Sequence, residues 1–191
     1  MTGITHALVS DIGGTTTDVA ILKDGRPVID PYGARVGPYR TMVEAVAMRT
    51  TGLGGDSEVH FVSEGLSGGV TLGPRRLVPV ALMATEAPDI IMPALEAQRR
   101  RTTTPGEFDG RFVRAVRGIN IDGLMPRDVA FLERIGDQVH LLGSILRTRM
   151  EQSALKRLVE RGLVQVAGVT PSDAAHVLGH LEVWNSDAAR M

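Results

Sequence analysis

The sequence of 191 residues predicts an α/β protein whose strand-rich first part is followed by a smaller, mainly helical part. Three observations lead to this expectation. Short apolar runs alternate with glycine turns up to residue 73, apolar residues recur at helical spacing from residue 126, and 43% of the chain is hydrophobic, which is enough for a core. We place the domain boundary near residues 122–126, with domains over residues 1–122 and 123–191.

The first part is expected to consist mostly of short strands. Apolar runs over residues 6–11 and 18–23 predict two of them, and the Asp24-Gly25 pair predicts a tight turn into a third, which starts at residue 27. The spacing of apolar residues over 39–49 predicts one short helix. A further strand pair is expected over 59–62 and 69–72, either a strand or a helix over 74–84, and a loop over 99–105.

The second part is expected to be mainly helical. Apolar spacing predicts helices over residues 126–135, 139–147 and 151–161, the last ended by Gly162, and then a strand over 163–167. Thr170 at the N-cap, Pro171 at the first helical position and Asp173 at the third predict the start of a final helix, which runs toward Leu181.

The composition argues against several classes of protein. The chain has 21 basic and 22 acidic residues, and a formal net charge of −1 does not suit a general nucleic-acid binder. The longest apolar stretch, residues 77–84, is interrupted by Pro79 and is too short to cross a bilayer. No signal-peptide pattern opens the chain, and it contains no cysteine. We therefore expect a cytoplasmic protein with neither a nucleic-acid nor a membrane partner.

The strongest chemical signal lies between the first two predicted strands, where the chain reads Asp11-Ile12-Gly13-Gly14-Thr15-Thr16-Thr17-Asp18. The two glycines permit positive φ and let successive amides approach one anion, while the threonines add hydroxyl donors. The two aspartates are candidate ligands of Mg²⁺, through its waters. The loop lacks the Gly-Lys-Ser/Thr of a Walker A motif and joins two strands. Since a plain hairpin turn needs only two residues, this composition favours phosphate binding.

These residues resemble a phosphate-binding hairpin of the superfamily that contains actin, hexokinase and the heat-shock chaperones. Three further motifs occur in the same order as in the hydantoinase A/5-oxoprolinase family, which includes N-methylhydantoinase, and the chain as a whole resembles that family. They are Gly-Leu-Gly-Gly-Asp-Ser at 52–57, Val-Thr-Leu-Gly-Pro-Arg at 70–75 and Thr-Pro-Ser-Asp-Ala-Ala-His-Val-Leu-Gly at 170–179. The resemblance covers residues 5–179 and is weak over 76–123.

The resemblance implies one lobe of an actin-like (ribonuclease H-like) ATPase fold and an ATP-dependent hydrolase that opens a small cyclic amide, such as 5-oxoproline or a hydantoin. It implies ATP and Mg²⁺ as cofactors, with Asp11 and Asp18 as the catalytic and metal-binding residues. The residues it implies for binding ATP are Gly13, Gly14, Thr15, Thr16, Thr17, Gly54, Gly55 and Ser57.

The resemblance also bears on partners. Actin-like ATPases bind nucleotide between two lobes, each with a phosphate hairpin, whereas this sequence contains the acid–glycine–threonine hairpin once. We therefore expect a single lobe that is inactive alone. The N-terminal lobe is its missing partner, and a second subunit is a further candidate.

Some positions leave alternatives open. Asp56 stands where family members often carry a third glycine, and its carboxylate would repel phosphate unless a metal lay between them. A purely structural turn is therefore the alternative for residues 52–57. Asp173, His176 and His180 lie at i, i+3 and i+7 and could share a helical face that holds Zn²⁺ or Mn²⁺, although a capping role already accounts for Asp173.

A second class of function also stays open. Residues 140–161 resemble a winged helix-turn-helix and carry five basic against two acidic side chains. The alternative function is a non-catalytic interaction or regulatory module. The alternative for the segment itself is a packed helical subdomain whose charges face water, and from it we expect no specific binding of DNA.

Overall fold

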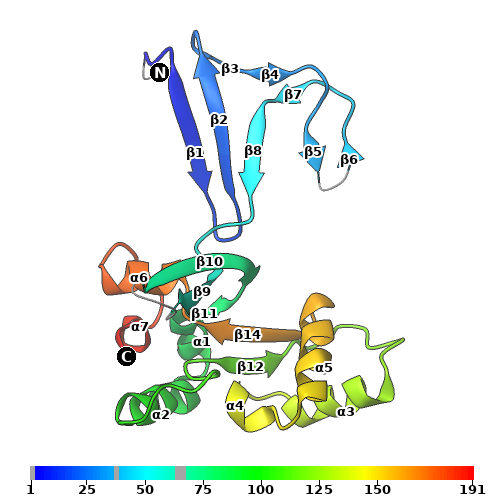
Figure 1. The fold of residues 1–191 in the computed structure, drawn as a ribbon, viewed down its shortest axis with the longest axis vertical. Coiled ribbons are helices and arrows are strands. Elements are labelled where there is room, and N and C mark those ends of the chain that lie inside the picture. Colours follow the sequence, from blue (N-terminus) through cyan, green and yellow to red (C-terminus); the bar gives the residue numbers. More distant parts are fainter. Residues whose placement is uncertain (1–2, 37–38, 63–67) are drawn as a thin grey trace. The chain divides into compact units, whose positions relative to one another are not determined.

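The computed structural model describes residues 3–36, 39–62 and 68–191. It is a mixed α/β structure, as the sequence predicts, and it divides into two compact units, Met1–Ser57 and Glu58–Met191 (Figure 1). The first unit consists of strands, and all the described helices belong to the second.

The first unit is built on an antiparallel sheet in which β2 (Thr17–Lys23) pairs with three other strands. β1 (Ala7–Ile12) lies on one side of β2, and β3 (Arg26–Pro27) and β8 (Met48–Thr51) lie on the other (Figure 1). Asp24 and Gly25 have φ angles of 51° and 74° between β2 and β3, which confirms the predicted tight turn.

The helix predicted over residues 39–49 is wrong. That segment forms β6 (Tyr39–Arg40), β7 (Ala45–Val46) and the start of β8; β6 pairs with β5 (Arg35–Val36), and β7 pairs with β4 (Ile29–Asp30). Met42 has a left-handed φ of 55°, which no helix interior accommodates, and Met42 and Val43 are 87% and 65% exposed. The apolar side chains that suggested a helix are therefore not buried against a core. Hydrogen bonding between paired strands determines the structure of this segment instead.

The second unit contains a four-stranded sheet in the order β11 (Val78–Pro79), β14 (Val164–Gly168), β12 (Phe112–Ala115) and β13 (His140–Leu141). β11 runs parallel to β14, and the other pairs are antiparallel. A separate hairpin of β9 (Ser57–Val62) and β10 (Gly69–Arg76) confirms the strand pair predicted over 59–62 and 69–72.

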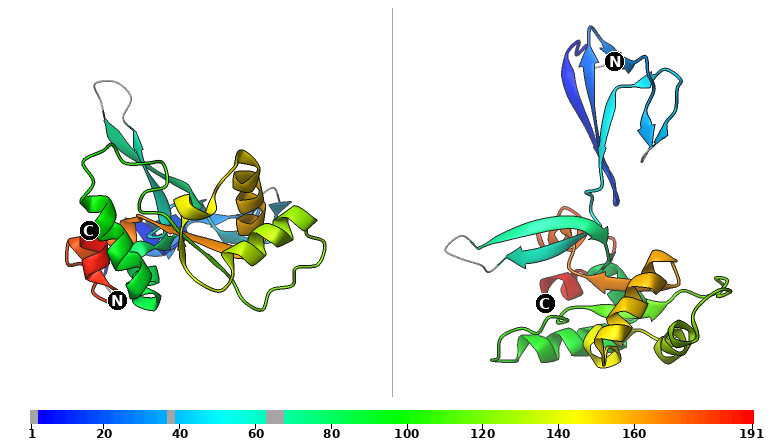
Figure 2. Two further views of the ribbon diagram at one scale, coloured as in Figure 1. Left: turned by 90° about the horizontal axis from the view of Figure 1, so that it is seen from below. Right: turned by 45° about the vertical axis from the view of Figure 1, so that its right-hand side comes forward.

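Seven helices accompany these strands in the described part of this unit (Figures 1 and 2). They are α1 (Val80–Glu86), α2 (Pro88–Arg99), α3 (Pro126–Ile135), α4 (Leu142–Ile145), α5 (Arg149–Glu160), α6 (Pro171–Val177) and α7 (Ser186–Arg190). α3 has the predicted bounds, and α5 and β14 lie within two residues of theirs. The helix predicted over 139–147 is partly wrong, because β13 takes its first residues and only α4 is helical.

Two apolar cores lie on opposite faces of the sheet. Adjacent residues of β12 point to opposite faces. Phe112 therefore joins the core under α1 and α2, whereas Val113 joins the core under α3 and α5. The predicted boundary near residues 122–126 thus lies inside the second unit, because β12 before it pairs with β14 after it. The division by contacts falls at Ser57 instead.

Candidate phosphate-binding site

The Gly-Thr loop closes the β1–β2 hairpin. The strand register places Asp11 opposite Asp18 and Ile12 opposite Thr17, and the amide of Gly13 donates to the carbonyl of Thr16 at 2.9 Å. This confirms the predicted hairpin. The positive φ that Gly13 and Gly14 permit is not used, because neither residue is left-handed. Instead, the two glycines let the backbone of residues 54–56 approach the loop closely.

The second glycine segment, residues 52–57, lies directly against this loop. The amide of Gly55 donates to the carbonyl of Gly13 at 3.1 Å, and the amide of Asp56 donates to that of Gly14 at 2.7 Å. The hydroxyl of Thr17 donates to the carbonyl of Leu53 at 2.8 Å. Two motifs separated by more than thirty residues thus form one structure, although both were predicted only as separate ligands of the nucleotide.

Gly54 is the point of closest approach. A Cβ atom at this position would lie 2.5 Å from the carbonyl oxygen of Gly13 and 2.6 Å from the carbonyl carbon of Gly14. The amide of Gly54 donates to the hydroxyl oxygen of Ser57 at 2.9 Å, and Ser57 is buried. Gly54, Gly55 and Ser57 therefore support the loop, and the amide of Gly55 is already used by the carbonyl of Gly13.

The donors left at the tip belong to the first loop. Among the described residues, the amides of Gly14, Thr15 and Thr16 form no hydrogen bond. Thr15 and Thr16 are half-buried, and the hydroxyl of Thr15 adds a further donor, whereas that of Thr16 donates to Asp18. Consecutive free amides beside threonine hydroxyls suit the oxygens of a phosphate, so the residues present fit the anionic part of ATP.

The two loop aspartates suit a divalent cation. Two carboxylates directly opposite each other on neighbouring strands repel one another unless a cation lies nearby. Asp18 accepts hydrogen bonds from the hydroxyls of Thr50 and Thr16, the latter at 3.5 Å, whereas Asp11 is exposed. The sequence did not point to Thr50, because only the pairing of β2 with β8 brings it to Asp18. The carboxyl ligands of this pair suit Mg²⁺.

Asp56 reaches the same loop. A Cβ atom at Gly14 would lie 3.0 Å from a carboxylate oxygen of Asp56, so the departure from the family pattern places negative charge beside a candidate phosphate contact. Because this carboxylate would repel a phosphate, we still expect a phosphate at the loop to bind together with a cation.

The metal cluster considered at Asp173, His176 and His180 does not form. Asp173 is buried, and its carboxylate accepts from the amides of Val80 and Ala81 at 3.2 and 2.8 Å, as well as from the amide and hydroxyl of Thr170. It thus caps α1 and α6 together. α6 ends at Val177, so His180 lies beyond the helix and is exposed, whereas His176 is buried. Within the described ranges, no group of three or more metal-ligating side chains occurs.

Several basic side chains of the segment that resembles a winged helix form hydrogen bonds or ion pairs with other groups of this chain. Arg157 donates twice to the buried carboxylate of Asp128, at 2.9 and 2.6 Å, and these bonds hold the pKa of Asp128 below its usual range. Arg161 donates to the carbonyl of Asp122, and Lys156 faces Glu160. These pairs accord with the packed helical alternative, and the expected lack of specific DNA binding stays a prediction.

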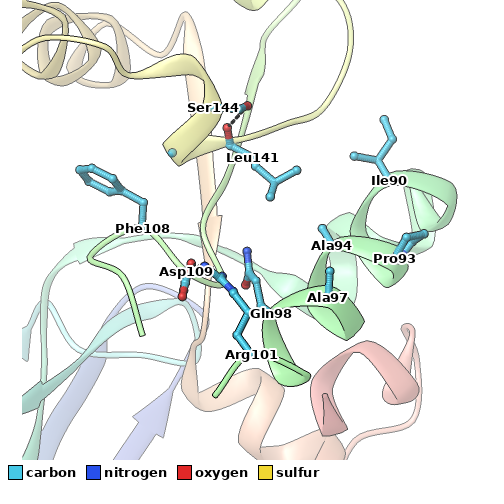
Figure 3. Close-up of a pocket in the computed structure, with 11 residues that line it drawn as sticks. Ile90, Pro93, Ala94, Ala97, Gln98, Arg101, Phe108, Asp109, Leu141 and Ser144 are labelled. Atoms are coloured by element: carbon cyan, nitrogen blue, oxygen red, sulfur yellow. Dashed lines mark hydrogen bonds and ion pairs between the residues drawn. The ribbon is translucent and has the colours of Figure 1, made fainter. Parts of the chain in front are cut away.

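The second unit has a groove of its own, about 620 Å³ in volume, beside α2 (Figure 3). Ile90, Pro93 and Phe108 contribute to its apolar lining, and the ion pair of Arg101 with Asp109, 2.7 Å apart, lies at one end (Figure 3). None of the site residues predicted from the sequence lines it. No helix in the described residues is long and apolar enough to cross a membrane.

The hairpin and its supporting glycine segment lie within the part of the chain that matches a known protein family. Residues 1–79 match the family model described as Hydantoinase/oxoprolinase, which confirms the predicted resemblance over this part of the chain. The motif at residues 170–179 lies outside the matched residues.

One similar solved structure is a nucleotide-free acetone carboxylase, described in connection with the mechanism of ATP-dependent acetone carboxylation. It shares 28% identity over 39% of this chain, with a TM-score of 0.31. The match spans 10% of that protein's chain. No curated protein matches this sequence.

Proposed function

We propose that this chain is part of an ATP-dependent cyclic amidohydrolase of the hydantoinase/oxoprolinase type and binds the phosphates of ATP through the β1–β2 hairpin. One observation carries the proposal: the 52–57 segment is hydrogen-bonded to the loop, while the amides of Gly14, Thr15 and Thr16 form no hydrogen bond among the described residues. The family match over residues 1–79 supports it.

The geometry of the loop supports the following role for each residue. The amides of residues 14–16 and the hydroxyl of Thr15 would bind phosphate oxygens, and Asp11 and Asp18 would hold Mg²⁺ through its waters. When bound, ATP would supply a phosphoryl group to the amide oxygen of the substrate, which would make that oxygen a better leaving group. The chain's own contribution is to position phosphates and to neutralise charge, which is the main task of proteins in phosphoryl transfer.

The proposed architecture is one lobe of an actin-like ATPase, with the N-terminal lobe as its partner and a cyclic amide as substrate. In such a cleft, closure of the second lobe removes water from the loop. The chain alone is then expected to bind Mg·ATP weakly and to release no ADP in steady state.

Calorimetric titration with Mg·ATP tests the binding. Thr15→Val removes a loop hydroxyl and Asp11→Ala removes one carboxylate, and each should weaken binding about tenfold or more. Thr5→Val and Asp24→Ala are matched controls, because Thr5 precedes β1 and Asp24 lies in the β2–β3 turn. Unchanged affinity in both loop variants, or absence of saturable binding by the wild-type chain, would contradict the proposal.

A further inference from the structure

A carboxylate and an imidazole that the proposed function does not use, those of Glu58 and His60, face each other in the second unit. Glu58 and His60 lie two positions apart on β9 and therefore point to the same side of that strand. Glu58 is buried, with 8% of its surface exposed, while the side chain of His60 is 43% exposed. The pair thus joins a fixed, buried acid to a base that solvent can reach.

The two carboxylate oxygens of Glu58 differ in their surroundings. Oε1 lies 3.0 Å from the guanidinium of Arg111. Oε2 is buried and, within the described residues, has no hydrogen-bond partner. A buried carboxylate oxygen without a donor or cation is costly, so this atom marks a position where a positively charged group is missing.

The distance between the facing atoms indicates what fits there. Nε2 of His60 lies 3.6 Å from Oε2 of Glu58, which is too long for a hydrogen bond. Two ligands about 2.1 Å from one tetrahedral metal ion are about 3.4 Å apart. The gap therefore suits a single ion between the two atoms better than a direct contact.

The surroundings hold Glu58 in place for such a role. The amide of Val59 donates to the carbonyl of Val169 at 3.3 Å, which fixes β9 beside the end of β14. Arg111 has its own backbone anchored on both sides, by Phe108 and Leu142. Gly168 leaves the space for its side chain, because a Cβ atom there would lie 2.8 Å from a guanidinium nitrogen of Arg111. Hydrogen bonding of this kind commonly orients the carboxylates that bind metals.

We propose that Glu58 Oε2 and His60 Nε2 bind one divalent transition-metal ion, for which Zn²⁺ is the probe. An imidazole ligand favours such an ion over Mg²⁺, which prefers oxygen. Only two protein ligands take part, so the remaining positions are open to water or to a carboxylate or phosphate oxygen of a bound small molecule. This site is independent of the phosphate-binding hairpin.

The chain contains a natural control. Nε2 of His6 lies 3.4 Å from a carboxylate oxygen of Asp24, nearly the same separation, but the two side chains are 63% and 76% exposed. Both side chains are open to solvent, so the Asp24 carboxylate has no need of a cation to compensate for burial. If burial and positioning make the site, His60 should matter for metal binding and His6 should not.

The test is titration of the metal-free chain with ZnCl₂ by calorimetry, with the imidazole signals of His60 followed by NMR. We expect one saturable site whose affinity falls about tenfold or more in His60→Ala and in Glu58→Gln, and is unchanged in His6→Ala. Excess Mg²⁺ should not displace Zn²⁺, and Asp18→Asn should bind it normally. This separates failure of the metal site from failure of the hairpin proposal.

Several results would overturn the assignment. They are the absence of saturable zinc binding, wild-type affinity in His60→Ala, or loss of binding in His6→Ala. A His60 signal that responds to pH but not to zinc would show that the pair is an ion pair only. Should Glu58→Gln fail to fold, His60→Ala still decides the question, because His60 is half exposed and its loss leaves the Glu58–Arg111 contact in place.

Discussion

Replacing Gly54 by alanine should separate the two glycine segments. The new Cβ atom would lie 2.5 Å from the carbonyl oxygen of Gly13 and 2.6 Å from the carbonyl carbon of Gly14, closer than such atoms approach in folded proteins. Both neighbours are backbone atoms, so no side-chain rotation relieves the overlap. Residues 52–57 must move away from the loop.

The cost follows from the contacts that this movement breaks. Two backbone hydrogen bonds, from Gly55 to Gly13 and from Asp56 to Gly14, depend on the close approach. Each contributes about 0.5–1.5 kcal/mol, so their loss amounts to about 2 kcal/mol. At about 1.4 kcal/mol for each factor of ten, the amides of Gly55 and Asp56 should lose about 30-fold of their protection against hydrogen exchange.

Hydrogen exchange measured by NMR at these two amides is the assay. Gly52→Ala is the matched control, because no atom lies within 4 Å of a Cβ at Gly52. The alanine at position 54 should also weaken binding of Mg·ATP, whereas the alanine at position 52 should not. Equal exchange rates in the two variants would refute the packing argument.

Three further predictions concern single carboxylates. Asp173→Ala removes four hydrogen bonds that cap two helices, so the free energy of unfolding should fall by about 2–4 kcal/mol, and an effect no larger than that of the exposed-site control Asp187→Ala would contradict the capping role. The bonds from Arg157 lower the pKa of Asp128 from its ordinary value of 3.8, so this carboxylate stabilises the fold above about pH 4 and loses that effect as the pH falls further. Asp128→Asn should therefore flatten this part of the curve of unfolding free energy against pH. An unaltered curve would exclude the linkage between this carboxylate and stability. Asp56→Asn removes negative charge beside Gly14 and should raise the affinity for inorganic phosphate without Mg²⁺ several-fold, measured by NMR titration, whereas unchanged affinity would place the phosphate elsewhere.

Local signals in the sequence predicted the elements that depend on neighbouring residues. The Asp24-Gly25 turn and the capping box of Thr170 with Asp173 both have the predicted geometry. Each is set by side chains and backbone groups within a few residues, so tertiary structure has little to override. The Gly-Thr hairpin belongs to the same class.

Long-range pairing accounts for what the sequence could not predict. Residues 39–49 have helical spacing but form strands, because segments up to thirty residues away pair with them. The carboxylate of Asp173 caps α1 through the amides of Val80 and Ala81, more than ninety residues away, and no local sequence pattern predicts this contact. Likewise, both glycine motifs could be predicted, but their packing at Gly54 could not.

The most direct test of the account is an NMR titration of the isotopically labelled chain with Mg·ATP, because it reports each amide separately and detects weak binding. We predict saturable shifts centred on the amides of Gly14, Thr15 and Thr16, with smaller shifts in residues 54–57. Shifts confined to other segments, such as the groove beside α2, or no saturable shift at millimolar Mg·ATP, would contradict the assignment of the hairpin as the phosphate-binding site.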